Sequence, residues 1–475
     1  MILLGFLLFV TNCGIIFSQG GSHIEVKVLT YQGTICQQQD RGHFWHITDL
    51  HWDPDYKVTM NPNTVCPSSS KPVLNPGKWG SYLCDSNWDL INLTLHKMKT
   101  FHPKPDFILW TGDDTPHVAD EKLGEDVVLR IISKLTKLIQ VVFPGTKVYS
   151  AMGNHDFHPK NQLPGNYHKI YNRTAELWAP WMDHQSIAIF NQGAFYTEKL
   201  LGRTDQRIIV LNTNLYYSSN KYNVGINDPA GQFQWLEEIL SNAMTAKEKV
   251  YIIGHVPPGF FEKKRWTSWF VEHFNNRYVE IIQKYHSVIA GQFFGHHHTD
   301  SFRMFYNHSG SPIGVMFITP GITPWKTTLP GVENGANNPA IRVFEYDTNT
   351  LEVQDVVTYF FNLSYANAIA PLWQLEYRLT EAFKVPDGTV KSMQTVLDKL
   401  YHENDYLQKY YKLNSVNYDL AKCDMNCRID QICAIKEVDF AKYEECVKRE
   451  SSSSALTAQV PIISFLLLSI VLLQF

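Results

Sequence analysis

The chain has 475 residues and a formal net charge of −4, from 42 Lys and Arg against 46 Asp and Glu. This balance excludes a protein that grips nucleic acid through excess positive charge, so we expect no nucleic acid polymer among the partners. With 44% hydrophobic and 19% charged residues, the composition is that of a globular protein with a sizeable core rather than of a disordered chain.

The first twenty residues, MILLGFLLFVTNCGIIFSQG, are an apolar stretch that ends in small residues. This pattern predicts a secretory signal peptide over residues 1–20, cleaved after Gly20. Because the positively charged start of such signals is missing, an uncleaved anchor or a buried helix stays open as the alternative.

Six short runs rich in apolar and aromatic residues come next, and each passes at once into polar residues: HFWHITDLHW, DFILWTGDD, KVYSAMGNHD, RIIVLNTN, KVYIIGHVPPG and VIAGQFFGHHH. We interpret each run as a buried strand that ends in a loop. Helix-like segments lie between several of them, including residues 125–142 and 232–246. Strands that alternate with helices predict a layered α/β fold, in which ligand sites collect at the strand ends.

The C-terminal part differs in composition. Beyond residue 370 the chain is rich in Tyr, Lys, Asp and Glu with helical spacing, which predicts a small, mostly helical subdomain over residues 371–450. Residues 451–475 run from a serine cluster into an apolar tail, Val460 to Phe475. Because this tail is shorter than the roughly 20 residues of a spanning helix, a removable GPI-attachment signal fits better, with the attachment site within Ser451 to Ser454. A short tail anchor is the alternative.

Eight cysteines are present, and Cys13 would leave with the signal. An oxidising compartment favours disulfides. The spacing suggests one bond between Cys66 and Cys84, an unpaired Cys36, and two local pairs among Cys423, Cys427, Cys433 and Cys446. A zinc knuckle built from the last four is the alternative, but no His stands at finger spacing.

Four N-x-S/T sequons agree with passage through the secretory route: Asn92, Asn172, Asn307 and Asn362. Together with the two terminal signals, they predict a glycoprotein held by a GPI anchor in the outer leaflet of the plasma membrane, facing the extracellular side. A shed or secreted form is a further expectation.

Five of the six strand ends carry side chains that can bind a metal ion: Asp49, His51, Asp113, Asn154, His155, His255, His296, His297 and His298. Taken singly, each is most simply a helix cap, a turn residue or a buried histidine. A layered sheet, however, brings such ends into one cleft. Their joint occurrence therefore predicts a metal site.

Alternation along the chain suggests which histidines face that site. In an extended segment alternate side chains share a face, so His296 and His298 can both point into the cleft while His297 points away. The same alternation puts Asp49 and His51 on one side of their strand end.

The ligand set holds at least three imidazoles, two carboxylates and an amide oxygen, and its motifs contain no thiolate. This is more than one ion needs, and the mixture suits Zn²⁺, Mn²⁺ or Fe better than Ca²⁺ or Mg²⁺. Two ions bridged by a carboxylate are an arrangement that clamps oxygens at phosphorus, and Asp113 is the natural bridge.

The order D-x-H, G-D, G-N-H-D, G-H and G-H-x-H across residues 42–300 resembles the calcineurin-like metallophosphoesterase superfamily. The resemblance implies a four-layer α/β/β/α sandwich as the catalytic domain, over residues 36–370, with two Zn²⁺ per chain. It also implies the ligands: Asp49, His51 and His298 for one ion, Asn154, His255 and His296 for the other, and Asp113 shared between them.

His117 follows Asp113 by four residues, and this spacing, with GNHDFHP and GHVPPG, is similar to acid sphingomyelinase and its relatives. We expect no saposin domain, since only about 20 residues separate the signal from the first motif strand. The chain therefore resembles the acid sphingomyelinase-like phosphodiesterases, and its GPI-type tail points to a membrane-anchored member.

The resemblance implies hydrolysis of small phosphodiesters, nucleotide-like or phospholipid headgroups, by a hydroxide that bridges the two ions. His117 and His155, which are not metal ligands in this scheme, are the candidate catalytic proton donors, and the choice between them stays open. The alternative function is a cell-surface lipid-binding or regulatory protein with little turnover. We expect a monomer.

Overall fold

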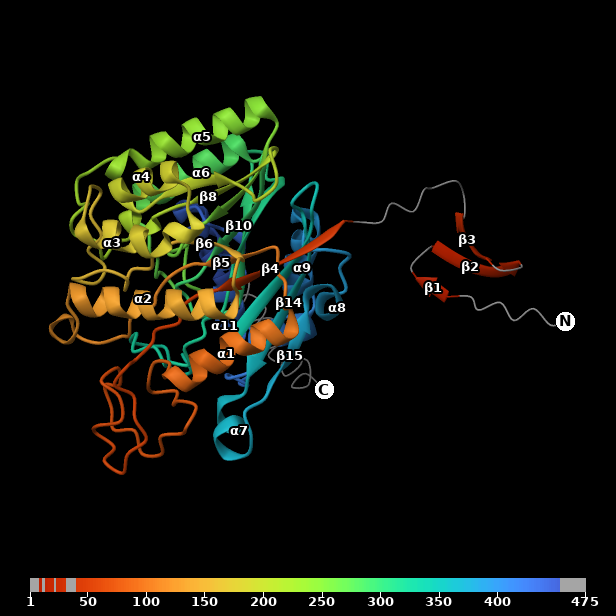
Figure 1. Ribbon diagram of the computed structural model, residues 1–475. Coiled ribbons are helices and arrows are strands. Elements are labelled where there is room, and N and C mark those ends of the chain that lie inside the picture. Colours follow the sequence, from red (N-terminus) through yellow and green to blue (C-terminus); the bar gives the residue numbers. More distant parts are fainter. Residues whose placement is uncertain (1–7, 11–12, 21–22, 31–39, 453–475) are drawn as a thin grey trace, which may run out of the picture. The chain divides into compact units, whose positions relative to one another are not determined.

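The computed structural model describes residues 8–10, 13–20, 23–30 and 40–452, which Figure 1 shows as a ribbon. The chain divides into two compact units, Met1–Arg41 and Gly42–Phe475. In the first unit three strands pair antiparallel: β1 (Leu8–Val10), β2 (Cys13–Gly20) and β3 (His23–Thr30).

Several predictions fall partly or wholly outside the described residues. These are the start of the signal peptide, Cys36, the attachment-site residues Ser453 and Ser454, and the apolar tail. Cleavage after Gly20 and GPI attachment stay predictions. Among the residues that the structure does describe, no helix is long and apolar enough to cross a bilayer.

The second unit is built on two six-stranded sheets. The first sheet has the order β15-β14-β13-β4-β5-β6. Three of its strands are mutually parallel: β4 (Arg41–Ile47), β5 (Phe107–Trp110) and β6 (Lys147–Ser150). The other three form an antiparallel half: β13 (Ala340–Asp347), β14 (Val353–Phe361) and β15 (Trp373–Arg378).

The second sheet has the order β11-β12-β10-β9-β8-β7. Its four central strands are parallel: β8 (Gln206–Val210), β9 (Lys249–Ile253), β10 (Ile289–Phe294) and β12 (Pro312–Ile318). Antiparallel strands close both edges: β7 (Tyr196–Lys199) and β11 (Ser301–Tyr306).

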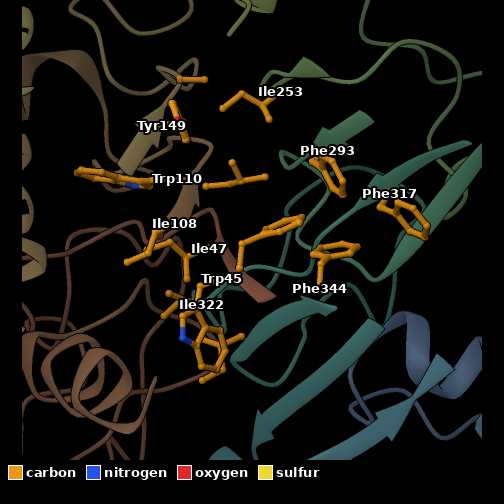
Figure 2. Close-up of a cluster of buried hydrophobic side chains, with 14 of the residues drawn as sticks. Trp45, Ile47, Ile108, Trp110, Tyr149, Ile253, Phe293, Phe317, Ile322 and Phe344 are labelled. Carbon is orange, nitrogen blue, oxygen red and sulfur yellow. The ribbon is translucent and has the colours of Figure 1, made fainter. Parts of the chain in front are cut away.

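An aromatic core joins the two sheets face to face. The ring of Phe44 in β4 lies 5.3 Å from that of Phe293 in β10 and 5.7 Å from that of Tyr251 in β9. Figure 2 shows Phe293 close to Phe317 and Phe344 in this cluster. The strands are buried on both faces, which explains why they read in the sequence as nearly continuous apolar runs.

Helices cover the outer faces. Three helices lie on the side of the first sheet: α1 (Trp88–Phe101), α2 (Glu125–Val142) and α3 (Lys169–Trp178). There the ring of Trp110 in β5 lies 5.5 Å from that of Trp178 in α3. The next helix, α4 (His184–Gly193), packs against α3 and β7. Two more share a separate cluster with the outward residues of the second sheet: α5 (Gln232–Ala246) and α6 (Glu272–Tyr285). The predicted four-layer α/β/β/α sandwich is confirmed, with α2 and α5 at the predicted residues.

The C-terminal segment is not helical throughout. Strand β15 pairs with β14, so the boundary expected at residue 370 falls inside the first sheet, next to α7 (Leu363–Ala368), and helices begin only at residue 379. These are α8 (Leu379–Phe383), α9 (Val390–His402), α10 (Asn404–Asn414), α11 (Met425–Lys436) and a helical stretch over 440–452. The expected disulfides are present, and the pairs left open by the sequence are Cys423–Cys427 and Cys433–Cys446, beside Cys66–Cys84.

Candidate metal centre

All seven predicted ligands follow the carboxyl ends of parallel strands, and the structure brings them together. The first group is formed by the loop after β4 and the loop after β10. His298 Nε2 lies 3.2 Å from His51 Nε2 and 3.5 Å from Asp49 Oδ1. These three side chains could hold one metal ion.

The second group joins loops from both sheets. The amide oxygen Oδ1 of Asn154, after β6, lies 2.9 Å from His296 Nδ1 and 3.1 Å from His255 Nε2. The two ring nitrogens are 3.3 Å apart. Nitrogen and oxygen lone pairs therefore converge on a second point, where another cation could sit.

Asp113 lies between the two groups. Its Oδ2 atom is 3.4 Å from His51 Nε2 and 3.1 Å from His255 Nε2, while its Oδ1 accepts the backbone N–H of His155 at 2.8 Å. One carboxylate is thus within reach of both groups, as a bridging ligand must be.

The backbone explains how the ligands converge. Five of the seven have positive φ angles: Asp49 (52°), His51 (39°), Asp113 (59°), His296 (69°) and His298 (59°). The side chains face as expected, with His296 and His298 at the ligand groups and His297 turned to Glu262. Alternation in an extended segment is not the reason, because the residues sit in left-handed turns beyond the strand ends. Non-glycine residues seldom adopt this conformation, and such strain concentrates at functional sites.

Glycines let two of these loops approach each other closely. A Cβ atom on Gly153 would lie 2.1 Å from Asp113 Oδ1, and one on Gly112 would lie 2.1 Å from the backbone nitrogen of Gly153. Gly112 also has φ +82°. The G-D and G-N-H-D motifs thus need their glycines for contact between loops.

Backbone carbonyls fix the tautomers of two histidines. His51 Nδ1 lies 2.7 Å from the carbonyl of Thr115, and His255 Nδ1 lies 2.6 Å from that of Thr111. Because a carbonyl can only accept, each Nδ1 carries the hydrogen and each neutral ring turns the lone pair of Nε2 toward Asp113. This is how imidazole ligands are commonly held for a metal.

The electrostatics of the buried centre favour bound positive charge. Burial lowers the pKa of His51, but the carboxylates of Asp49 and Asp113 outweigh it and raise the pKa to about 9. Burial also lowers the pKa of His255, but the Asp113 carboxylate outweighs it and raises this pKa to about 9. Protons on these two rings take the place that cations would fill in the loaded protein.

The donor set therefore fits metal ions. When the His255 ring is neutral, its Nε2 atom is an acceptor that faces two further acceptors, Asp113 Oδ2 and Asn154 Oδ1. Asp49 Oδ1 is buried, and no hydrogen-bond partner for it is found among the described residues. Without a proton or a metal ion between them, these lone pairs would repel each other in a site from which water is largely excluded.

His117 and His155 lie beside the first group. The ring of His117 is 4.1 Å from that of His51 and 4.5 Å from that of His155. His155 Nδ1 is buried and lacks a hydrogen-bond partner among the described residues. Burial holds the pKa of both rings well below the ordinary value, and the charge of His51 lowers them further. The Asp113 carboxylate opposes this shift only in part.

The sequence pattern did not single out Asp85, which orients His117. Its carboxylate accepts the backbone N–H of His117 at 2.6 Å, lies 3.0 Å from His117 Nδ1, and accepts the hydroxyl of Thr323 at 3.0 Å. Trp325 stacks on the His117 ring, with centroids 3.7 Å apart and planes at 7°. The only signal in the sequence was the place of Asp85 directly after Cys84, which the disulfide holds.

A cleft of about 200 Å³ opens above the buried ligands. His117 and His155 line it together with Asn154, His296 and His298, whereas Asp49, His51, Asp113 and His255 lie beneath its floor. Aromatic side chains make up much of its wall: Tyr217, Phe261, Trp269 and Trp325. A phosphate bound at the ligand groups would therefore carry its organic substituents along aromatic surfaces.

The four predicted glycosylation residues lie away from this floor, and each is partly exposed: Asn92 in α1, Asn172 in α3, Asn307 in the turn after β11, and Asn362 at the start of α7. Their exposure is compatible with glycans, and glycosylation stays a prediction.

Two family models match the chain. The calcineurin-like phosphoesterase family matches residues 42–300, and the acid sphingomyelin phosphodiesterase C-terminal region matches residues 311–453. Among curated proteins, the chain is 59% identical over 432 residues to acid sphingomyelinase-like phosphodiesterase 3b of Homo sapiens. The alignment covers 90% of this chain and 94% of the relative.

Two more distant relatives also match over most of their length. Cyclic GMP-AMP phosphodiesterase SMPDL3A of Homo sapiens is 41% identical over 417 residues, with 86% of this chain and 90% of the relative covered. Sphingomyelinase phosphodiesterase C of Dictyostelium discoideum is 36% identical over 431 residues, with 87% and 94% covered.

Proposed function

Because the chain belongs to the acid sphingomyelinase-like phosphodiesterases, within the calcineurin-like phosphoesterases, we propose that it hydrolyses small phosphodiesters at a centre of two Zn²⁺ ions. The observation that carries the proposal is the position of Asp113, whose Oδ2 lies within 3.4 Å of a ring nitrogen from each ligand group. Nitrogen and oxygen ligands without thiolate suit Zn²⁺.

Asp49, His51 and His298 would hold one ion and Asn154, His255 and His296 the other, with Asp113 between them. A pair of divalent cations, when bound, supplies acidified water as nucleophile and positive charge for the phosphate oxygens. The carbonyls of Thr111 and Thr115 keep their histidines in the tautomer that leaves Nε2 free.

The leaving oxygen needs a proton, and His117 and His155 are the titratable side chains that border both the cleft and the first ligand group. The Asp85 carboxylate faces His117 Nδ1, so it stabilises the protonated ring and directs Nε2 away from itself. Trp325 fixes the plane of that ring from one side. We assign these two histidines to proton transfer.

The substrate we propose is a phosphodiester with an organic group that fits an aromatic cleft, either nucleotide-like or a phospholipid headgroup. A nucleotide-type substrate is supported by the cyclic GMP-AMP phosphodiesterase named among the relatives, and a lipid by the sphingomyelinase. A panel of soluble nucleotide diesters and sphingomyelin micelles would separate the two.

We further propose that the mature chain is a GPI-anchored monomer on the extracellular face of the plasma membrane. Three disulfides among the described cysteines and the apolar C-terminal sequence support this location. Release of the protein from intact cells by phosphatidylinositol-specific phospholipase C tests the anchor.

The enzymatic test uses purified protein and bis(p-nitrophenyl) phosphate. We expect turnover that 1,10-phenanthroline abolishes and that added Zn²⁺ restores, together with two Zn²⁺ per chain by elemental analysis. Tight metal binding without chelator-sensitive turnover of any diester would favour the alternative, a cell-surface lipid-binding or regulatory protein.

A further inference from the structure

His297 stands between two ligands but is not one of them. Its ring is turned away from the metal groups and is 5% exposed. A buried imidazole needs partners for both nitrogens, and the structure supplies both. These partners connect the middle histidine of the G-H-H-H sequence to the cleft wall.

The partners differ in kind. Trp269 Nε1 lies 2.8 Å from His297 Nε2, and since an indole nitrogen can only donate, His297 accepts there. Its Nδ1 therefore carries the hydrogen and donates to Glu262 Oε2 at 3.1 Å. The ring thus links the indole to a buried carboxylate.

The carboxylate of Glu262 is fixed in place, and it anchors this series of hydrogen bonds. It is 1% exposed and accepts from Arg303 at 2.6 Å, Thr299 at 2.6 Å and Asn414 at 2.9 Å. With its other contacts made, the carboxylate cannot turn away from His297 without losing several charge-assisted bonds.

Trp269 connects this hydrogen-bond network to the cleft. Its ring stands edge-on to the His296 ring, with centroids 4.8 Å apart and planes at 89°. Its carbonyl accepts the backbone N–H of Ser218 at 2.7 Å, and its indole N–H donates to His297, so separate hydrogen bonds hold its backbone and its side chain. Tyr217 also contacts His296, at 5.4 Å, so the two rings form one aromatic wall beside a ligand of the second group.

We propose that His297 is a positioning residue that holds the indole of Trp269 as the aromatic wall of the cleft, and that this wall selects phosphodiesters with a large flat substituent. The inference rests on the proposed phosphodiesterase function and deepens it. It gives the middle histidine a role in specificity rather than in metal binding or proton transfer.

Two substitutions test the two hydrogen bonds of His297 separately, the one from Trp269 and the one to Glu262. In His297→Gln the amide reaches the place of Nε2 and can accept from Trp269. In His297→Asn the shorter amide can still donate to Glu262 but does not reach the indole. The pair therefore differs mainly in the bond to the indole, and in both variants Glu262 keeps its hydrogen bonds from Arg303, Thr299 and Asn414.

The readout compares two substrates with the same leaving group, bis(p-nitrophenyl) phosphate and methyl p-nitrophenyl phosphate. We expect His297→Asn to raise KM for the aromatic diester by about fivefold, a loss on the scale of one hydrogen-bonded contact, with less than a twofold change for the methyl diester. His297→Gln should stay near wild type for both. Equal effects of the two variants, or equal effects on the two substrates, would overturn the proposal.

Trp269→Phe keeps a ring but removes the N–H donor, and it leaves the Glu262 cluster intact if the His297 variants fold poorly. We expect it to raise KM for the aromatic diester as His297→Asn does, and we expect no further rise when both changes are combined. Additive effects would contradict the coupling. Crystal structures of the Gln and Asn variants supply a readout that is independent of turnover. The indole should stay against His296 only in the first, and an unmoved indole in both would refute the inference even if no diester is hydrolysed.

Discussion

The carboxylate of Asp113 lies between His51 and His255, with Oδ2 at 3.4 Å and 3.1 Å from their Nε2 atoms. These histidines belong to loops of different sheets, so the contact joins the two halves of the sandwich at the floor of the cleft. A side chain shared in this way should control both metal positions at once.

We therefore expect Asp113→Ala to lower kcat/KM at least about 100-fold, since even the loss of an outer partner of a metal ligand costs roughly 10–100-fold. Metal content should fall below two ions per chain in the same sample. Phosphodiester turnover assays with elemental analysis check both. Wild-type turnover in this variant would remove the basis for a bridged centre.

Gly153→Ala should disrupt the same carboxylate through a different route. The added Cβ would lie 2.1 Å from Asp113 Oδ1, so either the loop after β6 or the carboxylate must move. We expect loss of metal and activity comparable to Asp113→Ala, although no ligand is changed. Gly314→Ala in β12, where the backbone is not left-handed and an added Cβ meets nothing closer than 3.5 Å, is the matched control for substituting a glycine.

Metal uptake should depend on pH in a defined direction. In the metal-free protein the pKa values of His51 and His255 are about 9, so both rings are protonated at pH 7 and must release protons when ions bind. Apparent Zn²⁺ affinity should therefore rise between pH 7 and 9, by about tenfold per pH unit for each proton displaced, and then level off.

A competition titration with a coloured chelator measures that affinity, and a pH indicator in weak buffer detects the protons. Zinc uptake at pH 7 without proton release would show that the two rings are already neutral. The carboxylates of Asp49 and Asp113 would then stabilise the protonated rings less strongly than the pKa values indicate.

Turnover at saturating Zn²⁺ should show the opposite trend. Burial holds the pKa values of His117 and His155 well below 6.5, and bound cations would replace the charge that His51 carries in the metal-free protein, so the protonated fraction of either ring falls as pH rises. If one of them donates to the leaving oxygen, kcat should decline from pH 5 to pH 8. The variant, His117→Asn or His155→Asn, that removes this decline identifies the donor. A flat wild-type profile would speak against both.

Asp85→Asn should act on His117 without touching substrate. The amide keeps the size of the side chain but no longer stabilises a protonated ring at the 3.0 Å contact with Nδ1. We expect kcat to fall about tenfold or more, within the range of general acid catalysis, while KM and metal content stay near wild type. An equal fall in metal content would mean that Asp85 supports the fold of the centre instead.

The sequence identified the strands and the ligands because both leave local marks. Strands buried on two faces appear as short apolar runs, and polar residues directly after them must lie at the edge of a sheet. The helices over 125–142 and 232–246 were predicted from their periodicity at the observed ends. The motif order was enough to indicate the family.

What the sequence left undetermined depends on contacts between distant segments. Strand β15 was assigned to a helical subdomain because its pairing with β14 leaves no periodic signal, and the ligand histidines were assigned to extended chain although their loops are left-handed. Asp85, Trp269 and Glu262 lack a motif of their own. Their roles come from partners 28 to 35 residues away, which only the packed sheets bring within hydrogen-bond distance. Local sequence patterns therefore determined the elements and the candidate metal ligands, while tertiary packing decided the orientation of each ring.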